Sequence, residues 1–174
     1  MAPHTVVTLI AIGIAALNGA TVLLALVLTK QEWRERLKGQ LSTQALFVVF
    51  LLAAGSVLGS LFVQYIAVIP PCDLCWWQRI FLYPVALIAA VGLIKNAPFP
   101  ALADYVLVLA LPGAAVALYQ HLLQMLPSGL LAPCSVSNEC AIRSIFELGY
   151  ITMPWMAFSV FAAIILIAVV ARKA

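Results

Sequence analysis

Charged residues are scarce in this sequence. Nine Lys or Arg and six Asp or Glu make 9% of the 174 residues charged, against about 25% in ordinary soluble proteins. Because 66% of the residues are hydrophobic, a folded exterior would have too few polar side chains to face water, so lipid must solvate it. The composition therefore excludes a soluble domain, a disordered chain, a collagen-like chain and a nucleic-acid-binding protein.

Cysteine and histidine are rare as well. The chain has four Cys and two His, and it shows no internal repeat or low-complexity tract. The cysteines fall into two close pairs, Cys72 with Cys75 and Cys134 with Cys140. An even number in close pairs makes them the natural centre of any chemistry that the chain carries out.

Five uncharged runs are long enough to form transmembrane helices, which need about 20 apolar residues to cross about 30 Å of hydrocarbon. The third run, Ile80–Ile94, is short and spans the bilayer only if its helix begins near Cys75, with Trp76 and Trp77 at the interface. The other runs are Val6–Leu28, a stretch within Leu41–Ile69, about Tyr105 to Leu126, and Trp155–Ala171. The predicted fold class is an all-α membrane protein, a four-helix transmembrane bundle plus one additional N-terminal transmembrane helix.

Basic residues divide unevenly between the two ends of these spans. Seven of the nine lie on one side: Lys30, Arg34, Arg36, Lys38, Lys95, Arg172 and Lys173. Only Arg79 and Arg143 lie on the side of the four cysteines. Because an excess of Lys and Arg marks cytoplasmic loops, we expect the N-terminus and both cysteine pairs outside and the C-terminus inside. The first run lacks a basic n-region, which favours a span over a cleaved signal peptide.

The spans divide the chain into two predicted parts. Residues 1–40 hold the additional helix and a basic cytoplasmic loop, and residues 41–174 hold the four-helix bundle with two extracytoplasmic cysteine loops. The long connection Pro127–Met153 contains Ile142–Tyr150, whose apolar spacing fits a short surface helix, with an irregular loop as the alternative. Gly55 and Gly59 form a GxxxG pattern, which is either a helix-packing face or a coincidence.

The cysteine pairs admit three interpretations. A structural staple, a tetrahedral metal site and a redox relay all use cysteines at such spacings in an extracytoplasmic compartment. If the third helix starts around Pro71, then Cys72, Cys75 and Arg79 share one face, and the helix N-terminus together with the Arg79 cation favours a thiolate. Asp73 opposes this effect. A thiolate near ambient pH serves disulfide exchange but not a staple, so the redox relay is favoured.

Polar residues near the same membrane edge are candidates for a ligand site. His121 lies about 7 Å below the interface on the fourth span, at a depth similar to that of Arg79, so both donors are predicted to converge on one oxygen-bearing ligand. Gln78, Gln64 and Trp76 are further candidates. The alternatives are an interface anchor for Arg79, a histidine satisfied by nearby polar groups, interhelical hydrogen bonds for the glutamines and a place in the aromatic belt for Trp76.

These residues together resemble the disulfide bond formation protein B family, DsbB. The similarity rests on Pro71-Cys72-Asp73-Leu74-Cys75-Trp76-Trp77-Gln78-Arg79, on Gln64 before it, on Tyr119-Gln120-His121-Leu122-Leu123-Gln124, and on Ile151-Thr152-Met153-Pro154-Trp155. It extends from about Gln44 to the C-terminus. The first helix is additional to the family's usual four, and the close spacing of Cys134 and Cys140 is similar to the short-loop BdbC-like branch.

The resemblance implies a function. It suggests a quinone-dependent oxidoreductase of a bacterial plasma (inner) membrane that reoxidises a DsbA-like thioredoxin-fold protein and passes two electrons to a membrane quinone, ubiquinone or menaquinone. Catalysis would rest on Cys72, Cys75, Cys134 and Cys140, without a metal, and the quinone would bind near Arg79, His121, Gln78, Gln64 and Trp76. The alternatives are an enzyme similar to vitamin K epoxide reductase, whose cysteine pairs would be expected in the reverse order, and a non-enzymatic structural or zinc-binding membrane subunit.

Overall fold

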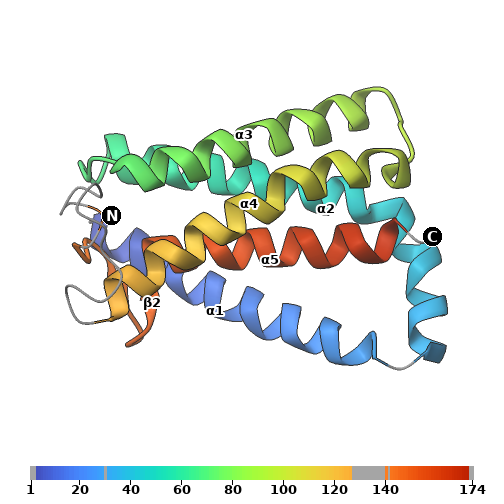
Figure 1. The fold of residues 1–174 in the computed structure, drawn as a ribbon, viewed down its shortest axis with the longest axis horizontal. Helices are drawn as coiled ribbons and strands as arrows, with labels where there is room; N and C mark the ends of the chain where they lie inside the picture. The colour runs from blue at the N-terminus through green and yellow to red at the C-terminus, as the bar shows by residue number, and fades with distance from the viewer. Residues whose placement is uncertain (1–2, 30, 127–139, 141, 173–174) are drawn as a thin grey trace.

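The computed structural model consists of five long helices that run side by side, with a short hairpin at one end (Figure 1). It describes residues 3–29, 31–126, 140 and 142–172, and the side chains of 5–29, 44–126, 140 and 142–172. The elements are α1 (Pro3–Val27), α2 (Gln31–Tyr65), α3 (Asp73–Ile94), α4 (Phe99–Met125), β1 (Phe146–Glu147), β2 (Ile151–Thr152) and α5 (Met153–Ala171). Each of the helices is long and apolar enough to cross a membrane, which confirms the predicted fold class.

The N-termini of α3 and α5 are set by local sequence. Pro70 and Pro71 lack an N–H group and hold extended backbone, so α3 starts at Asp73 with Cys72 in the N-cap position, slightly later than the expected start around Pro71. The Thr152 hydroxyl accepts a hydrogen bond from the Trp155 backbone N–H at 3.3 Å and caps α5. Both starts lie at the same end of the bundle, directly beside the cysteines.

The buried core lies between α4 and α5, with α2 and α3 packed around them. Gly113 of α4 faces Phe161 of α5, and a β-carbon at this glycine would overlap the aromatic ring. Small residues of this kind let transmembrane helices approach closely. The helix α1 lies at the periphery, where Ile14 and Leu17 pack against the core. The four-helix arrangement that holds the cysteines is therefore tightly packed, and α1 is attached to its side.

The two ends of the bundle differ in what they carry. The N-terminus, the hairpin and the start of α3 lie at one end, here called the cysteine end (residues 66–72, 140 and 142–152), and the C-terminus lies at the other (Figure 1). At that opposite end, Arg172 pairs with Asp104 at 2.8 Å, and both side chains are more than half exposed. The placement of the termini at opposite ends follows from an odd number of spans.

Two sequence expectations differ from the structure, and the alternative left open for the GxxxG pattern is decided. The residues that follow Gln31 are expected to belong to a loop, but in the structure they form the first turns of α2. The segment Ile142–Tyr150, expected as a helix or an irregular loop, contributes to a hairpin instead, because Leu148 and Gly149 adopt positive φ angles of 52° and 78° that reverse the chain. The GxxxG pattern makes no close helix contact, since a β-carbon at Gly55 or Gly59 would have no atom within 4 Å.

Candidate functional site

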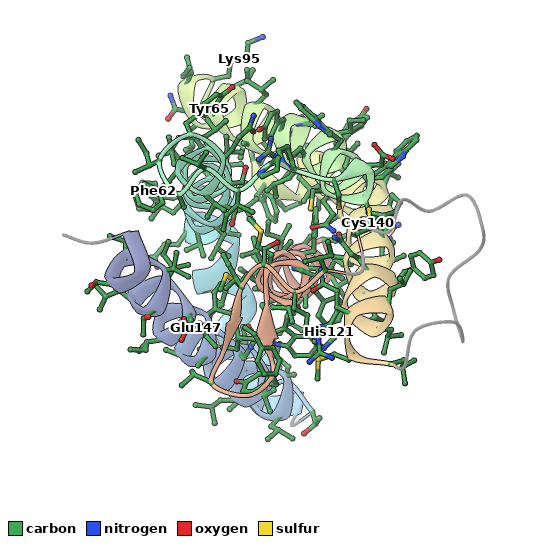
Figure 2. The ribbon with its side chains drawn as sticks, turned by 90° about the vertical axis from the view of Figure 1, so that its left-hand side faces the viewer. Phe62, Tyr65, Lys95, His121, Cys140 and Glu147 are labelled. Atoms are coloured by element: carbon green, nitrogen blue, oxygen red, sulfur yellow. The ribbon has the colours of Figure 1, made fainter. Side chains whose placement is uncertain are left out.

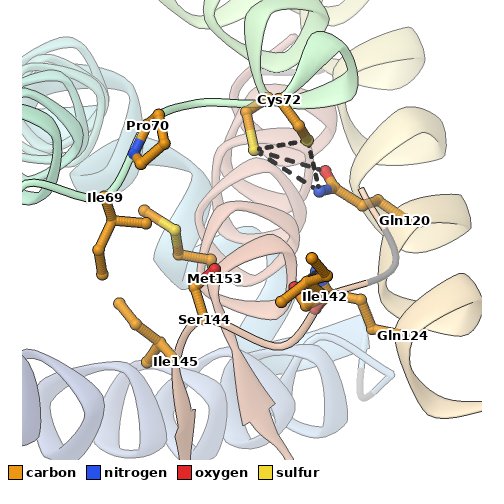
Figure 3. Close-up of a pocket in the computed structure, with 10 residues that line it drawn as sticks. Ile69, Pro70, Cys72, Gln120, Gln124, Ile142, Ser144, Ile145 and Met153 are labelled. Atoms are coloured by element: carbon orange, nitrogen blue, oxygen red, sulfur yellow. Dashed lines mark hydrogen bonds between the residues drawn. The ribbon is translucent and has the colours of Figure 1, made fainter. Parts of the chain in front are cut away.

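The centre of the site is the Cys72–Cys75 pair at the start of α3. One residue caps the helix and the other lies in its first turn, three positions later, so the two side chains face the same direction. Their sulfur atoms lie 3.4 Å apart, and the Cys72 thiol donates a hydrogen bond to Cys75 (Figure 3). Cys72 is buried and Cys75 is half-buried. The arrangement is a hydrogen-bonded dithiol.

Gln120 of α4 joins both sulfur atoms. Its side-chain nitrogen lies 3.2 Å from the Cys72 sulfur and 3.5 Å from the Cys75 sulfur, and Figure 3 shows the amide pointing at the pair. The Gln78 amide donates to the Gln120 side-chain oxygen at 2.6 Å, and the Cys75 thiol donates to the same oxygen at 3.8 Å, so both ends of the Gln120 amide take part. Because Gln120 is 1% exposed, these hydrogen bonds are made away from bulk water. Donors aimed at sulfur favour its anionic form.

Cys72 is held in its protonated form. Its hydrogen bond to Cys75 and, second, its burial raise the pKa of the Cys72 thiol well above the usual value. Protonated Cys72 keeps donating to Cys75, so the negative charge of the reduced pair resides on Cys75. The two cysteines therefore differ in role although they share one helical turn.

The loop cysteine Cys140 lies against this pair. It is fully buried and shares a side-chain hydrogen bond with Cys72. Gln124, one turn beyond Gln120 on α4, donates hydrogen bonds of 3.2 Å to the carbonyl oxygens of Cys140 and Ile142 and so holds this stretch of loop. Figure 2 shows Cys140 at the cysteine end, over the centre of the bundle. The other loop cysteine, Cys134, lies outside the described residues.

A small cavity of about 30 Å³ separates the pair from the loop (Figure 3). Its lining includes Cys72, Cys75, Gln120, Gln124 and Ile142. A water molecule needs roughly 10–15 Å³ of such volume, so this space suits one or two waters and not a ring compound. Cys140 approaches Cys72 from the loop side, outside this lining.

Arg79 lies one turn below Cys75 and faces α2. Its guanidinium donates to the Gln64 side-chain oxygen and, at 3.1 Å, to the backbone carbonyl of Ser60. The centroid of the Trp76 ring lies 5.2 Å from the guanidinium carbon in a cation–π arrangement, and Trp76 is about half exposed. Arg79 itself is 6% exposed. A buried guanidinium held by neutral groups keeps its full charge available to an electron-rich ligand.

A second, larger cavity of about 370 Å³ opens beside Arg79. Cys75, Gln78 and Arg79 line its end near the hairpin, and apolar residues of α1, α2 and α5 line the rest. Its volume falls within the roughly 300–1,000 Å³ of small-molecule sites. Cys75 therefore borders both cavities, whereas Cys72 borders only the small one beside the loop.

His121 is placed apart from this cavity. Its Nδ1 atom lies 2.9 Å from the Thr152 hydroxyl, and its ring packs against Trp155 at an interplanar angle of 45° with a centroid distance of 4.7 Å. Figure 2 shows His121 on α4 beside the hairpin. Among the described residues, His121 lines neither the small cavity nor the large one. The structure brings Arg79, Gln78 and Gln64 together and does not bring His121 to them.

Sequence reasoning overlooked two residues of this site. The sequence analysis names Gln120 and Gln124 only within the segment around His121, but both are turned towards the cysteines. Their spacing of four residues places them on one face of α4, which was a detectable signal. The sequence did not reveal which face of this nearly uniformly apolar helix meets the cysteine end.

Comparison with known proteins identifies the family of this chain. The family described as "Disulfide bond formation protein DsbB" matches residues 42–171. The chain belongs to the DsbB family. No solved structure matches the chain.

Several named relatives support the assignment. The chain is 37% identical over 121 residues to the SPbeta prophage-derived disulfide bond formation protein B of Bacillus subtilis, covering 67% of this chain and 78% of that protein. It is 34% identical over 123 residues to disulfide bond formation protein C of the same organism, covering 70% and 87%. A probable disulfide formation protein of Chlamydia trachomatis is 34% identical over 133 residues, covering 76% and 96%.

Family membership and the five spans together define a coarse function. The chain is a multi-pass protein of a bacterial membrane with an oxidoreductase role in disulfide bond formation, and it resembles the BdbC-like branch. The matched residues 42–171 include all four cysteines and leave out α1.

Proposed function

We propose that this protein reoxidises an extracytoplasmic thioredoxin-fold disulfide donor and passes two electrons through its cysteine pairs to a membrane quinone. The observation that carries the proposal is the placement of three sulfurs in sequence. Cys140 contacts Cys72, Cys72 contacts Cys75, and Cys75 faces the large cavity beside Arg79. This order connects an aqueous loop to the lipid phase through one helical turn.

The membrane orientation belongs to the same proposal. The cysteine end faces the extracytoplasmic side, where disulfides persist, and the C-terminus faces the cytoplasm. The distribution of basic residues supports this orientation. In this arrangement residues 41–174 carry the thiol chemistry, and residues 1–40 hold the additional helix.

Thiol exchange begins at the loop. A thiolate of the reduced donor protein attacks the Cys134–Cys140 disulfide at Cys134, forming a mixed disulfide and releasing the Cys140 thiolate. The second donor thiolate then displaces Cys134, which leaves the donor oxidised and the loop pair reduced. Cys140 next attacks the Cys72–Cys75 disulfide at Cys72, the sulfur it contacts, and releases Cys75 as a thiolate. Cys134 displaces Cys72 from Cys140, so the loop disulfide re-forms and both electrons reside on the Cys72–Cys75 pair.

The large cavity fits the electron acceptor. A quinone needs hydrogen-bond donors for its carbonyl oxygens and apolar surroundings for its ring and tail, and the cavity offers Arg79 and Gln78 at one end and apolar walls elsewhere. A quinone bound there would supply a two-electron, two-proton acceptor. Cys72 and Cys75 give up two electrons as their disulfide re-forms, Cys72 releases one proton, the second proton comes from water at the cysteine end, and Gln120 stabilises the charge on the sulfurs. His121 is held by Thr152 and Trp155 and orients the hairpin end of α5. In this proposal it does not contact the quinone ring.

Reconstitution tests the proposed function. Purified protein in lipid vesicles is mixed with a reduced thioredoxin-fold protein and either ubiquinone or menaquinone. We expect one quinone reduced for each disulfide formed, measured by quinone absorbance and by thiol counting on the donor. Disulfide formation without quinone reduction, or no reaction with either quinone, would reject the proposal.

Leucine substitutions at Gln120 and Gln124 should slow different steps. Gln120→Leu removes the donor to both sulfurs, and charge-assisted hydrogen bonds contribute about 1.5–3 kcal/mol, so quinone reduction by the reduced pair should slow at least about tenfold. Gln124→Leu removes the hydrogen bonds that hold Cys140 over Cys72, so exchange between the pairs should slow instead. Stopped-flow measurement of each half-reaction separates the two effects.

The two variants serve as controls for each other. Both exchange a buried glutamine for leucine on the same face of α4, so a general loss of packing would affect both half-reactions in both proteins. Equal slowing of the two steps in the two variants would contradict the assigned roles. Thermal unfolding in detergent checks that each variant remains folded.

A further inference from the structure

The helix α1 contributes a wall to the large cavity. Ile10, Gly13, Ile14 and Leu17 lie in its lining and recur at positions i, i+3, i+4 and i+7, which form one face of a helix. The facing residues of α2 include Leu52, Gly55, Ser56, Gly59 and Val63, which also share one face. The cavity therefore lies between α1 and α2, and residues of α5 such as Ala157 and Val160 complete its lining.

The two helices meet at the cysteine end and are held apart beyond it. Val7 of α1, Val63 of α2 and Ile145 form a small buried cluster at that end. The lining along α2 then continues from Val63 to Leu51, about 18 Å along the helix axis at the rise of an α-helix. This shape, narrow and long with polar groups at one end, differs from a packing defect.

Glycine keeps the middle of the cavity open. A β-carbon at Gly13, Gly55 or Gly59 would have no atom within 4 Å, so these positions border empty space. The Ser60 hydroxyl, which also lies in the lining, is buried and has no hydrogen-bond partner in the described part of the chain. An unpartnered buried hydroxyl next to Arg79 and an apolar groove together indicate a ligand with a polar head and an apolar tail.

We infer that α1 forms one wall of the electron-acceptor site and that the groove between α1 and α2 holds the isoprenoid tail of the quinone. The inference rests on the proposed function, because it assigns the tail of the same acceptor. One continuous cavity supports the inference, because Cys75 and Arg79 line one end of it and Gly13 lines a part farther along. Residues before position 42 lie outside the family match, so this wall is supplied by the part of the chain that the family does not include.

Filling the groove tests the inference. Gly13→Leu and Gly55→Leu place side chains from opposite walls into the space, while Gly19→Leu on the same α1 helix adds the same side chain outside the lining. All three exchange glycine for a better helix former, so helix propensity changes equally. The probes are ubiquinone and menaquinone with their tails, and the corresponding tail-free benzoquinone and naphthoquinone.

The expected result depends on the tail. Each methylene removed from an apolar site lowers affinity about fourfold, and leucine displaces several of them, so KM for the tailed quinone should rise at least about tenfold in Gly13→Leu and Gly55→Leu. KM for the tail-free quinone should stay within about twofold. Quinone extracted with the purified protein, a measurement that does not depend on activity, should fall in both variants and be retained in Gly19→Leu.

Other outcomes overturn the inference in distinguishable ways. If Gly13→Leu retains as much quinone as Gly19→Leu while Gly55→Leu loses it, the tail lies along α2 and α1 does not line the site. If a phospholipid is extracted from the wild type and lost from Gly13→Leu without a change in KM, the groove holds lipid. Equal rises in KM for the tailed and the tail-free quinones would mean that the substitutions disturb the end of the cavity that binds the quinone ring. If the wild type reduces the tail-free quinones but not the tailed ones, this inference fails and the proposed function stands, whereas failure with all quinones rejects both.

Discussion

Replacing Cys140 by Ser should stop turnover and leave the donor protein captured on Cys134. Cys140 is the sulfur that contacts Cys72, so its loss removes the nucleophile that transfers electrons between the pairs. We expect steady-state reoxidation to fall at least about a thousandfold, as when a covalent nucleophile is deleted. Cys134 remains as a lone thiol that exchanges with the disulfide of the oxidised donor, and acid quenching followed by alkylation should trap the mixed disulfide before the donor's second thiol reverses the exchange. Non-reducing electrophoresis and mass spectrometry detect it.

Cys72→Ser is the matched control, because it leaves the loop pair intact. This variant should oxidise one equivalent of donor per chain, as the Cys134–Cys140 disulfide is consumed once, and then stop. Cys140→Ser should oxidise none. Continued turnover in either variant would contradict the relay.

The contact between the two pairs has a direct covalent test. In a Cys75→Ser, Cys134→Ser double variant, the remaining cysteines are the two that share a hydrogen bond, so mild oxidation should join Cys72 to Cys140. Peptide mapping under non-reducing conditions checks the bond. Cys75→Ser combined with Cys140→Ser leaves Cys72 and Cys134, which should cross-link more slowly. The reverse order of rates would place Cys134, and not Cys140, next to Cys72.

Much of the fold was predictable because the membrane imposes simple rules. A span must satisfy its backbone hydrogen bonds internally and must be about 20 residues long, so apolar runs define all five helices. The helix ends are governed by local residues, such as Pro70 and Pro71 before α3 and Thr152 before α5. The hairpin was missed because its apolar residues happen to follow helical spacing, whereas the backbone at Leu148 and Gly149 decides the turn.

The site was only partly predictable for a different reason. Spacing along one helix puts Cys72, Cys75 and Arg79 on one face, which requires no tertiary information. The partners from other helices depend on rotation about each helix axis, and apolar spans leave that rotation undefined. The rotation of their helices brings Gln120 and Gln64 to the site. It turns His121 towards Thr152, although His121 lies at a depth similar to that of Arg79. The spacing of Gly55 and Gly59 leaves a packing face and a coincidence both open, and their empty surroundings show that absence of a side chain also makes a cavity.

Arg79→Ala should weaken quinone use far more than donor exchange. The guanidinium lines the head of the large cavity, and a hydrogen bond from a charged donor contributes about 1.5–3 kcal/mol, so KM for quinone should rise about ten- to a hundredfold. Oxidation of the first donor equivalent, which uses the loop pair, should keep its rate. Arg143→Ala is the control, because Arg143 is the other arginine at the cysteine end and is exposed. Equal effects of Arg79→Ala on both steps would assign it a structural role only.

Gln64 should share this effect through Arg79. Because Gln64 accepts a hydrogen bond from the guanidinium, Gln64→Leu leaves the cation in place but less well oriented, and KM for quinone should rise by a smaller factor than in Arg79→Ala. Residues in one hydrogen-bond network are not additive, so the double variant should resemble Arg79→Ala alone. Arg79→Lys should fall between these, since a lysine point charge cannot hold Gln64 and the Ser60 carbonyl together. If the double variant instead shows the product of both single effects, Gln64 contacts the quinone independently of Arg79.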